Sequence, residues 1–275
     1  MSVKKEFKHI KIEKVEEGNY AVISINRPDR LNALQLLTIQ EIAEALEPMA
    51  VDPNIRCVVL RGTKDFTKKP AFSAGADLAT KLNQDEETPS LISQCDYKYK
   101  RHKCYDLIEE FPKIIIAAVD GFALGGGFEL TLVCDIVIAS KRSVFGFPEI
   151  KRGIFPADGG TQRLVRSLGK VRAKQMMVFG DHYSAEQIYE WGLISYLVDD
   201  DKFEDFVHEK ASYIGNAATN SLFVIKKCIN YGTQVPLKIG MQFEELGFGV
   251  NAYSEDVREG INSFLERRPP KFKGR

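Results

Sequence analysis

The chain has 275 residues, enough for one large or two modest domains around a sizeable core. Its 38 basic and 38 acidic side chains balance, which argues against a general role in binding nucleic acid or a charged membrane surface. No stretch has the length and apolar character of a membrane-spanning helix or a signal peptide, so we expect a cytoplasmic protein. The five cysteines fit no metal-binding spacing and the four histidines are scattered, so free thiols and no metal site are expected.

Apolar periodicity and turn residues predict strands mixed with helices over the first two-thirds of the chain and helices alone in the last quarter. The expected strands are residues 10–15, 20–25, 57–60, 114–119, 135–139 and 194–198. The expected helices are residues 37–49, 90–110, 160–167, 171–179, 184–191, 203–217, 221–232, 239–253 and 254–266. This order fits an α/β core over residues 1–200 and a helical subdomain over residues 201–275.

A few residues are expected to set the ends of these elements. Gly18 and Asn19 are typical of the turn between the first two strands. Pro48 is expected to disturb the last turn of the first helix, because its ring cannot donate a backbone hydrogen bond. Asp158 has the position of an N-cap, and Ser184 begins a capping-box pattern.

A basic cluster lies on the helix predicted over residues 90–110. Its members are Lys98, Lys100, Arg101 and Lys103. Such a run usually forms a solvated face, and the rival interpretation is contact with a phosphate group. The candidate buried positions of the same helix are Leu91, Ile92, Cys95, Tyr97, Cys104, Leu107 and Ile108.

The chain's most informative stretch is residues 121–130, where glycines follow a buried strand and lead directly into a helix. Backbone N–H groups at such a turn are free to bind a negatively charged oxygen. Glu129 lies near the start of that helix among apolar neighbours, so its carboxylate must be paired or functional.

A second carboxylate, Glu149, follows Pro148 at the end of the next apolar stretch. Two neighbouring carboxylates cannot both ionise easily, so one would hold a proton and the pair would supply an acid and a base. A purely structural pair is the alternative, and these arguments leave it open. The glycine spacing fits neither a dinucleotide-binding fingerprint nor a phosphate-binding P-loop, and no nucleophile-elbow motif is present.

Residues 116–135, IAAVDGFALGGGFELTLVCD, resemble the signature of the crotonase superfamily, in particular of the enoyl-CoA hydratases. Further matching pieces occur in the same order over essentially the whole chain. They are residues 25–28, 32–34, 72–77, 145–149, 156–164, 183–187, 191–193 and 264–268.

The resemblance implies a spiral of β-β-α units with a C-terminal helical trimerisation subdomain, commonly assembled as a trimer or a dimer of trimers. It implies an acyl-CoA thioester as substrate, with CoA as part of the substrate and no separate cofactor. The family's oxyanion hole, formed by two backbone N–H groups, corresponds to Ala76 and Gly126. Its two catalytic glutamates correspond to Glu129 and Glu149.

The implied reaction is the reversible syn addition of water to a 2-enoyl-CoA, or the reverse dehydration of a 3-hydroxyacyl-CoA. Glu129 would accept the proton of the attacking water and Glu149 would protonate C2. The alternatives are another crotonase reaction, such as double-bond isomerisation or hydration of a cyclic dienoyl-CoA, and a non-catalytic RNA-binding homologue. The neutral charge and the presence of both glutamates disfavour the last.

Contacts with CoA are also implied by the resemblance. The residues expected to line the CoA path are Arg30, Leu31, Ala74, Ala76, Asp77, Leu78 and Gly126. The basic end, residues 271–273, resembles tails that reach a CoA phosphate across subunits, and a frayed terminus is the alternative.

Two departures from the family pattern stand near the site: Phe128 and Asp158 replace small residues, and Asp158 is either the N-cap or a third polar group near the acyl chain. The segment 81–100, which lines the acyl pocket in the family, matches nothing recognisable.

Overall fold

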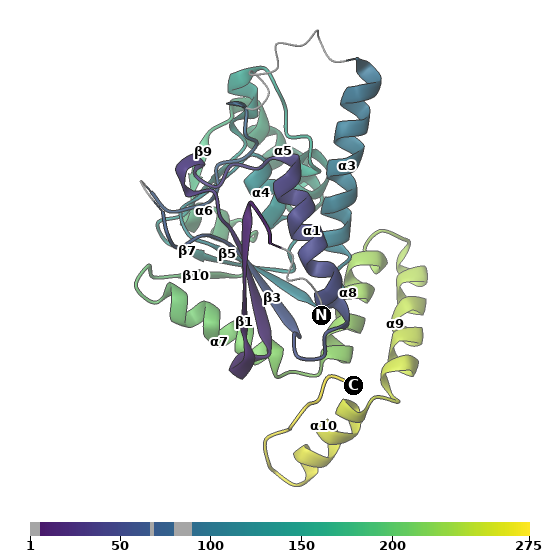
Figure 1. Cartoon of the computed structure of the whole chain (residues 1–275). Coiled ribbons are helices and arrows are strands. Elements are labelled where there is room, and N and C mark those ends of the chain that lie inside the picture. The colour runs from purple at the N-terminus through teal and green to yellow at the C-terminus, as the bar shows by residue number, and fades with distance from the viewer. Residues whose placement is uncertain (1–5, 67–68, 80–89) are drawn as a thin grey trace.

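The computed structural model describes residues 6–66, 69–79 and 90–275, and its core is a six-stranded sheet (Figure 1). The strands lie in the order β1-β2-β3-β5-β7-β10; β1 pairs with β2 antiparallel and the remaining neighbours are parallel. Their bounds are β1 Ile10–Val15, β2 Tyr20–Ile25, β3 Cys57–Gly62, β5 Ile114–Val119, β7 Ile136–Ser140 and β10 Tyr196–Val198. These bounds lie within two residues of the sequence-based expectations.

A second sheet of four short strands lies in the order β4-β6-β8-β9. Its strands are β4 Ala71–Ser73, β6 Phe122–Leu124, β8 Val144–Gly146 and β9 His182–Ser184. Three successive passes of the chain, β3–β4, β5–β6 and β7–β8, each give one strand to either sheet before a helix follows. This repeated β-β-α order is the expected spiral, and the predicted fold class is confirmed.

Helices cover both faces of the large sheet, which explains why every residue of β3 and β5 is buried. On one face the sheet packs against α1 (Leu36–Val51) and α3 (Leu91–Glu109). On the other face it packs against α7 (Phe203–Gly215). Alternate residues of a strand point to opposite faces, so Val58 belongs to the first cluster and Val59 to the second.

The other helices within the described residues are α4 Gly126–Thr131, α5 Gly160–Phe179, α6 Ala185–Glu190, α8 Thr219–Gly232, α9 Leu237–Asn251 and α10 Glu255–Leu265. Whereas α7 lies on the sheet, α8, α9 and α10 extend away from it as an arm (Figure 1). The division at residue 200 stays a prediction. No helix among the described residues is both long and apolar enough to cross a bilayer, and the same residues contain no cluster of His, Cys, Asp and Glu that could hold a metal ion.

Several expected element ends can be compared with the structure. The hairpin turn places Asn19 in the left-handed region, and the Ser184 hydroxyl accepts a hydrogen bond from Gln187 N–H, as predicted. Gly169 breaks α5 near the predicted gap, with φ 76°. The expected disturbance at Pro48 is not met, because α1 continues three residues past it to Val51.

The burial predicted for α3 is only partly right. Cys104 and Ile108 are buried, but the side chains of Leu91, Ile92, Cys95 and Leu107 are exposed. Leu91, Ile92 and Cys95 belong to the first turns of α3. Figure 1 shows these turns projecting beyond the packed layers, where no other element of the described residues covers them.

One buried ion pair joins the helical arm to the sheet. Lys226 on α8 lies 2.8 Å from the carboxylate of Asp135 and also donates to the Lys113 carbonyl. The same carboxylate accepts the N–H of Ile115 on β5 at 2.8 Å. Both side chains are largely withdrawn from water, so each compensates the other's charge.

Replacing Asp135 by alanine is expected to lower the free energy of unfolding by about 3–5 kcal/mol, because it leaves a buried lysine unpaired. Chemical denaturation followed by circular dichroism measures the change. The exposed carboxylate of Asp199, which pairs with Lys141 and Lys202, is the matched control: Asp199→Ala should leave the denaturation midpoint unchanged. Equal midpoints for all three proteins would contradict this account of how the arm is anchored.

Candidate active site

The glycine turn that leads from β6 into α4 forms one wall of the candidate site. Gly125 adopts φ 50°, a conformation that side chains rarely allow. A methyl group at Gly125 would lie only 2.5 Å from the Oε1 atom of Glu149. The turn therefore needs glycine both for its backbone shape and to admit a carboxylate against the chain.

A second turn, residues 74–78, lies opposite and is held by the segment after β2. Ala74 N–H donates to the Leu31 carbonyl at 2.9 Å, and Asp77 N–H donates to the Leu34 carbonyl at 3.0 Å. The Asp77 carboxylate is 2.7 Å from Arg27 and accepts from Gln35. These contacts confirm that the Leu31 segment borders the turn, and they show that the Asp77 side chain is used within the protein.

The two turns bring the amides of Ala76 and Gly126 together. A methyl group built on Gly126 would lie 3.8 Å from Ala76 N, and one built on Gly75 would lie 3.4 Å from Gly126 N. Within the part of the chain that the structure describes, neither amide donates to a backbone oxygen. Two adjacent free N–H groups can stabilise an oxygen on which negative charge develops.

Glu129 is buried beside these amides, with 2% of its surface exposed. Its Oε1 atom accepts hydrogen bonds from Asp158 N–H at 2.8 Å and from Gly160 N–H at 2.7 Å. The loop before α5 thus fixes one oxygen of the carboxylate. The other oxygen receives no hydrogen bond from the described residues.

Glu149 lies in the short 3-10 helix Pro148–Arg152 (η3), against the glycine turn. Its Oε2 atom is buried, and no described residue hydrogen-bonds to it. A buried carboxylate oxygen without a partner is costly, so it marks a place where a polar group from outside the chain can bind.

Both glutamates hold their protons more tightly than usual. Burial, and then the negative charge of Asp158, raise the pKa of Glu129 to about 7. Burial is also the largest cause for Glu149, whose pKa rises to about 7 with a contribution from Asp158. Near neutral pH the pair can therefore hold one proton and offer one base.

Asp158 is not the N-cap that its position suggested. Gly159 takes that place, and no side chain caps the helix. Asp158 is instead buried, and its carboxylate is bound by Arg101 at 2.5 Å and by Lys98 at 2.9 Å. Burial opposes its ionisation, but the hydrogen bonds and charge of Arg101, followed by those of Lys98, lower its pKa to about 2.

The basic cluster on α3 therefore divides in a way that the sequence did not predict. Arg101 is only 1% exposed, so the solvated-face interpretation is wrong for it. Lys100 does face solvent and pairs with Asp96. Lys98, Arg101 and Tyr105 lie three or four residues apart and share one helix face, and the Tyr105 hydroxyl donates to the Gly126 carbonyl at 3.1 Å. The only sequence signal for this face was its spacing, because a second cation, Lys98, stands three residues before Arg101.

A cavity of about 460 Å³ lies between the two turns and reaches Glu149. Ala76 and Leu78 line one side, and the basic residues Lys151, Arg152 and His182 also line it. Among the expected CoA contacts, Ala74, Ala76 and Leu78 thus border the cavity, whereas Arg30 is exposed nearby on the segment next to Leu31.

Phe128 does not reshape this cavity. Its ring stacks on Phe147 with centroids 4.9 Å apart and meets the edge of Phe145 at 5.1 Å. The side chain is 1% exposed and belongs to the core. It anchors in the core the helix that carries Glu129.

The basic tail is held in place rather than frayed. Lys271 N–H donates to Glu259 at 2.8 Å, and Lys273 N–H donates to Asp256 at 2.7 Å, both acceptors being on α10. Arg56 also donates to the Phe272 carbonyl at 3.0 Å. The expected contact with a CoA phosphate stays a prediction.

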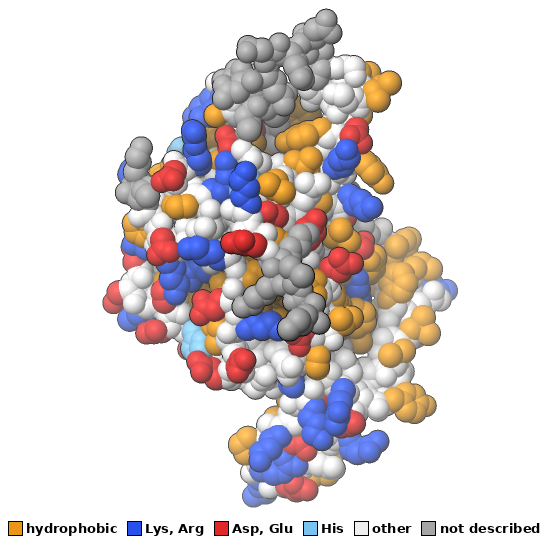
Figure 2. Space-filling view, viewed as in Figure 1, with side chains coloured by type: hydrophobic (Ala, Val, Ile, Leu, Met, Phe, Trp, Pro, Cys, Tyr) orange, Lys and Arg blue, Asp and Glu red, His pale blue; other side chains and the backbone are white. Residues whose placement is uncertain are grey.

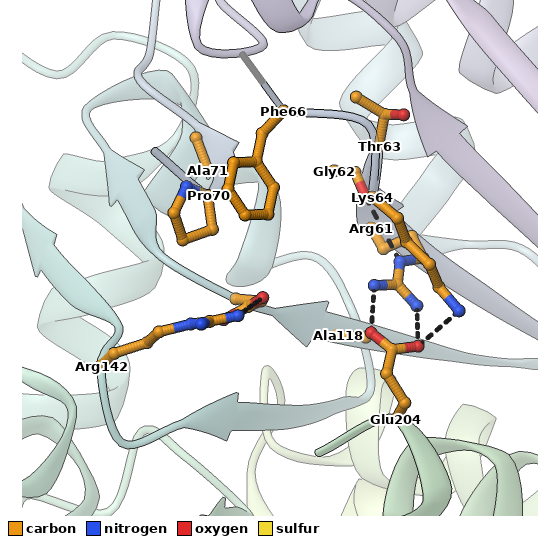
Figure 3. A pocket seen from close by; sticks show the side chains of 11 residues that line it. Arg61, Gly62, Thr63, Lys64, Phe66, Pro70, Ala71, Ala118, Arg142 and Glu204 are labelled. Carbon is orange, nitrogen blue, oxygen red and sulfur yellow. Dashed lines mark hydrogen bonds and ion pairs between the residues drawn. The ribbon is translucent and has the colours of Figure 1, made fainter. Parts of the chain in front are cut away.

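A smaller pocket of about 150 Å³ lies at the ends of β3 and β5 (Figure 3). Arg61 donates to both oxygens of Glu204, and Lys64 lies 2.7 Å from the same carboxylate. Arg142 donates to Asp120 in the same way. The charges in this pocket are mutually paired, and none of the expected site residues lies in it.

Comparison with known proteins identifies the family of the chain. Residues 16–275 match the family model described as enoyl-CoA hydratase/isomerase. The 2,3-dehydroadipyl-CoA hydratase of Escherichia coli is 36% identical over 92% of this chain and 95% of its own. The crotonyl-CoA hydratase of Syntrophomonas wolfei is 35% identical over 97% of this chain and 98% of its own. A crystal structure of an enoyl-CoA hydratase from Bacillus anthracis superposes with a TM-score of 0.88 at 32% identity, covering 98% of this chain and 100% of that one.

The chain therefore belongs to the enoyl-CoA hydratase/isomerase family, as the sequence resemblance implied. It is an enzyme, a hydro-lyase that acts on acyl-CoA.

The raised pKa values predict how stability depends on pH. A carboxyl group with a pKa of about 7 when folded binds more protons than the unfolded chain above its ordinary pKa of 4.5. The contribution of this group to the free energy of unfolding is fully present below pH 4.5, where the folded and unfolded chains both hold the proton. It is lost as the pH rises through about 7, because the buried group must then ionise. Glu149→Gln removes this loss, so the variant should melt about 2–5 °C higher than the wild type at pH 8 and show no such gain near pH 4.

Thermal melts recorded across this pH range test the prediction. Glu209→Gln, which alters an exposed carboxylate on α7, should follow the wild type at every pH. A constant difference between Glu149→Gln and wild type at all pH values would show that the Glu149 carboxyl group is not destabilised by burial.

Proposed function

We propose that the protein is an enoyl-CoA hydratase, which adds water in a reversible syn addition to a 2-enoyl-CoA thioester. The observation that supports this most is the proximity of the buried Glu129 and the partly buried Glu149, each with an oxygen that no described residue binds, beside two amides that donate to no backbone oxygen of the described residues. Water addition needs a base that takes a proton from the water and an acid that protonates the neighbouring carbon. Two carboxylates can divide these roles, whereas one carboxylate alone would have to perform both.

In the proposed reaction the thioester oxygen binds the N–H groups of Ala76 and Gly126. Negative charge grows on this oxygen as water attacks C3, so fixed donors stabilise the transition state more than the ground state. Because the donors belong to two braced turns, they need little reorganisation during the reaction.

Glu129 and Glu149 share the water and one proton. Glu129, fixed through Oε1, accepts a proton from the water as it attacks C3. Glu149 delivers a proton to C2 through the oxygen that has no partner within the described residues. A pKa of about 7 on each group makes either transfer nearly balanced at neutral pH. In the reverse direction the same groups dehydrate a 3-hydroxyacyl-CoA.

The CoA part of the substrate would enter along the cavity beside Ala74, Ala76 and Leu78. Lys151 and Arg152 line the same cavity and have the charge to bind phosphate groups. The relatives named above are a 2,3-dehydroadipyl-CoA hydratase and a crotonyl-CoA hydratase, so the acyl groups of this enzyme belong to the range that includes these short chains.

We further propose that the protein forms a homo-oligomer, a trimer or a dimer of trimers, through its C-terminal arm. Helix α9 buries no residue in the single chain. Its large apolar side chains gather on the side shown at the right of Figure 2. Leu237, Phe248, Val250 and Tyr253 are each more than 70% exposed. An apolar surface of this kind on a soluble chain is typical of a subunit interface.

Activity is tested with crotonyl-CoA, by following the loss of ultraviolet absorbance of the conjugated thioester. Glu129→Gln and Glu149→Gln should each lower kcat by about 10²–10⁴-fold, because each removes one proton-transfer group while keeping its size. Glu13→Gln, on the exposed side of β1, should keep the wild-type rate. Wild-type activity confined to moving a 3-enoyl double bond would replace hydration by isomerisation, and undiminished turnover in both variants would overturn the catalytic roles.

The oligomer is tested by light scattering coupled to size-exclusion chromatography. We expect a mass several times the 31.0 kDa of one chain. Phe248→Glu should shift the protein towards smaller species, since it places a charge in an apolar interface. Val51→Glu, which changes an equally exposed apolar residue on α1, should leave the mass unchanged. A wild-type mass of one chain would contradict the proposed assembly.

A further inference from the structure

We propose that Asp158 is a positioning residue of the active site: held as a permanent carboxylate by Arg101 and Lys98, it keeps one proton on the Glu129–Glu149 pair. The proposal rests on the function proposed above and adds a control of its proton balance. It assigns a role to a buried ion cluster that the two-glutamate mechanism does not use.

The first step is the direct connection between Asp158 and the site. Its N–H is one of the two donors that fix Glu129 Oε1, at 2.8 Å. Its carboxylate lies behind the amide donor, since a methyl group on Gly126 would be 3.5 Å from Asp158 Oδ2. One residue therefore contacts the proposed base through its backbone and faces the glycine turn with its charge.

The second step is that Asp158 cannot easily serve as a proton carrier itself. Arg101 Nε and Nη2 donate to both of its oxygens, and Lys98 binds Oδ1 at 2.9 Å. A carboxylate held by a bidentate guanidinium and an ammonium group stays ionised through the neutral range. Its role is thus that of a fixed negative charge.

The third step is the charge balance of the cluster. Three carboxylates, on Glu129, Glu149 and Asp158, lie with two cations, Arg101 and Lys98. If all three were ionised, one negative charge of this cluster would remain uncompensated beside the buried Glu129, Asp158 and Arg101. One proton shared by the two glutamates makes the cluster neutral, and it cannot move to Asp158, which the cations hold ionised.

Other charged and titratable groups also face the pair, and Arg152 is the one among them that acts on Glu149, since its charge lowers the pKa of that carboxyl group. The Tyr105 hydroxyl, on the same face of α3, donates to the Gly126 carbonyl. Arg152 on η3 and His182 on β9 border the open cavity, where water weakens their charge relative to that of a buried group. Lys151 also borders the cavity and pairs with Asp181 at 3.4 Å.

The test is the pH dependence of kcat/KM for crotonyl-CoA hydration. The active form carries one proton on the pair, so the wild-type profile should be bell-shaped. Asp158→Asn keeps the backbone N–H and the side-chain shape but removes the charge, so both limbs should move to lower pH by about one unit. Lys98→Met removes a positive charge and should move both limbs to higher pH by about half a unit.

Lys100→Met is the matched control. It removes a lysine two residues away on the same helix, whose partner is the exposed Asp96, and should leave both limbs in place. The Lys98 side chain is 36% exposed, so its variant should fold even if the loss of the buried Asp158 charge destabilises the protein. Reduced rates with unmoved limbs in both Asp158→Asn and Lys98→Met would overturn the proposal and leave the cluster a structural role.

A second measurement separates this proposal from the proposed hydration. The infrared band of protonated carboxyl groups, recorded against pH in the protein without substrate, should show a group titrating near neutral pH that moves down in Asp158→Asn. A wild type without hydratase activity that still shows this shift would reject hydration and keep the role of Asp158. An active wild type whose infrared titration is unchanged in Asp158→Asn would keep hydration and reject the role of Asp158.

Discussion

The arrangement of this molecule depends on the burial of carboxylates against a glycine backbone. A carboxylate removed from water is stable only if it is neutralised, paired or hydrogen-bonded. The protein uses each of these solutions within one small region. Asp158 is paired with two cations, Glu129 is hydrogen-bonded to two amides, and Glu149, whose Oε2 atom has no described partner, is neutralised by a proton up to a pKa of about 7.

The spiral fold explains why these groups meet. Each pass of the chain ends a strand of the small sheet at the same edge, and the turns that follow lie side by side. The turn after β4 brings the Ala76 amide, the turn after β6 brings Gly126 and Glu129, and η3 after β8 brings Glu149. Helix α3 then closes the site from one side with its polar face, and the aromatic cluster around Phe128 holds the helix that carries Glu129 in the core. The relative positions of the two amides and the two glutamates are therefore fixed by three structurally similar repeats rather than by one loop.

Much of this could be predicted from the sequence, because its local signals agree with its tertiary structure. The six strands of the large sheet, the C-terminal helices and the cap at Ser184 follow from periodicity and turn chemistry that packing does not override. The second sheet was not predicted, because its strands of three residues are too short to show a period. The proximity of Leu31 to the Ala74 turn followed from the family resemblance.

The role of Asp158 could not be predicted, since an aspartate two residues before a helix has the same pattern whether it caps the helix or binds a distant arginine. Its partner Arg101 is 57 residues away, and only the packing of α3 against the site decides between these uses. The exposed start of α3 was missed for a similar reason: an apolar residue predicts burial only where another element is present to cover it.

The central claim is that an acyl thioester binds with its carbonyl oxygen between the Ala76 and Gly126 amides and with its C2–C3 bond facing Glu129 and Glu149. The most direct measurement is a crystal structure of the protein with butyryl-CoA, which has the thioester but no double bond to react. The account predicts hydrogen bonds from both amides to the thioester oxygen and both glutamate side chains on the same face of C2 and C3. A thioester oxygen that contacts neither amide, or an acyl chain directed away from the two glutamates, would contradict it.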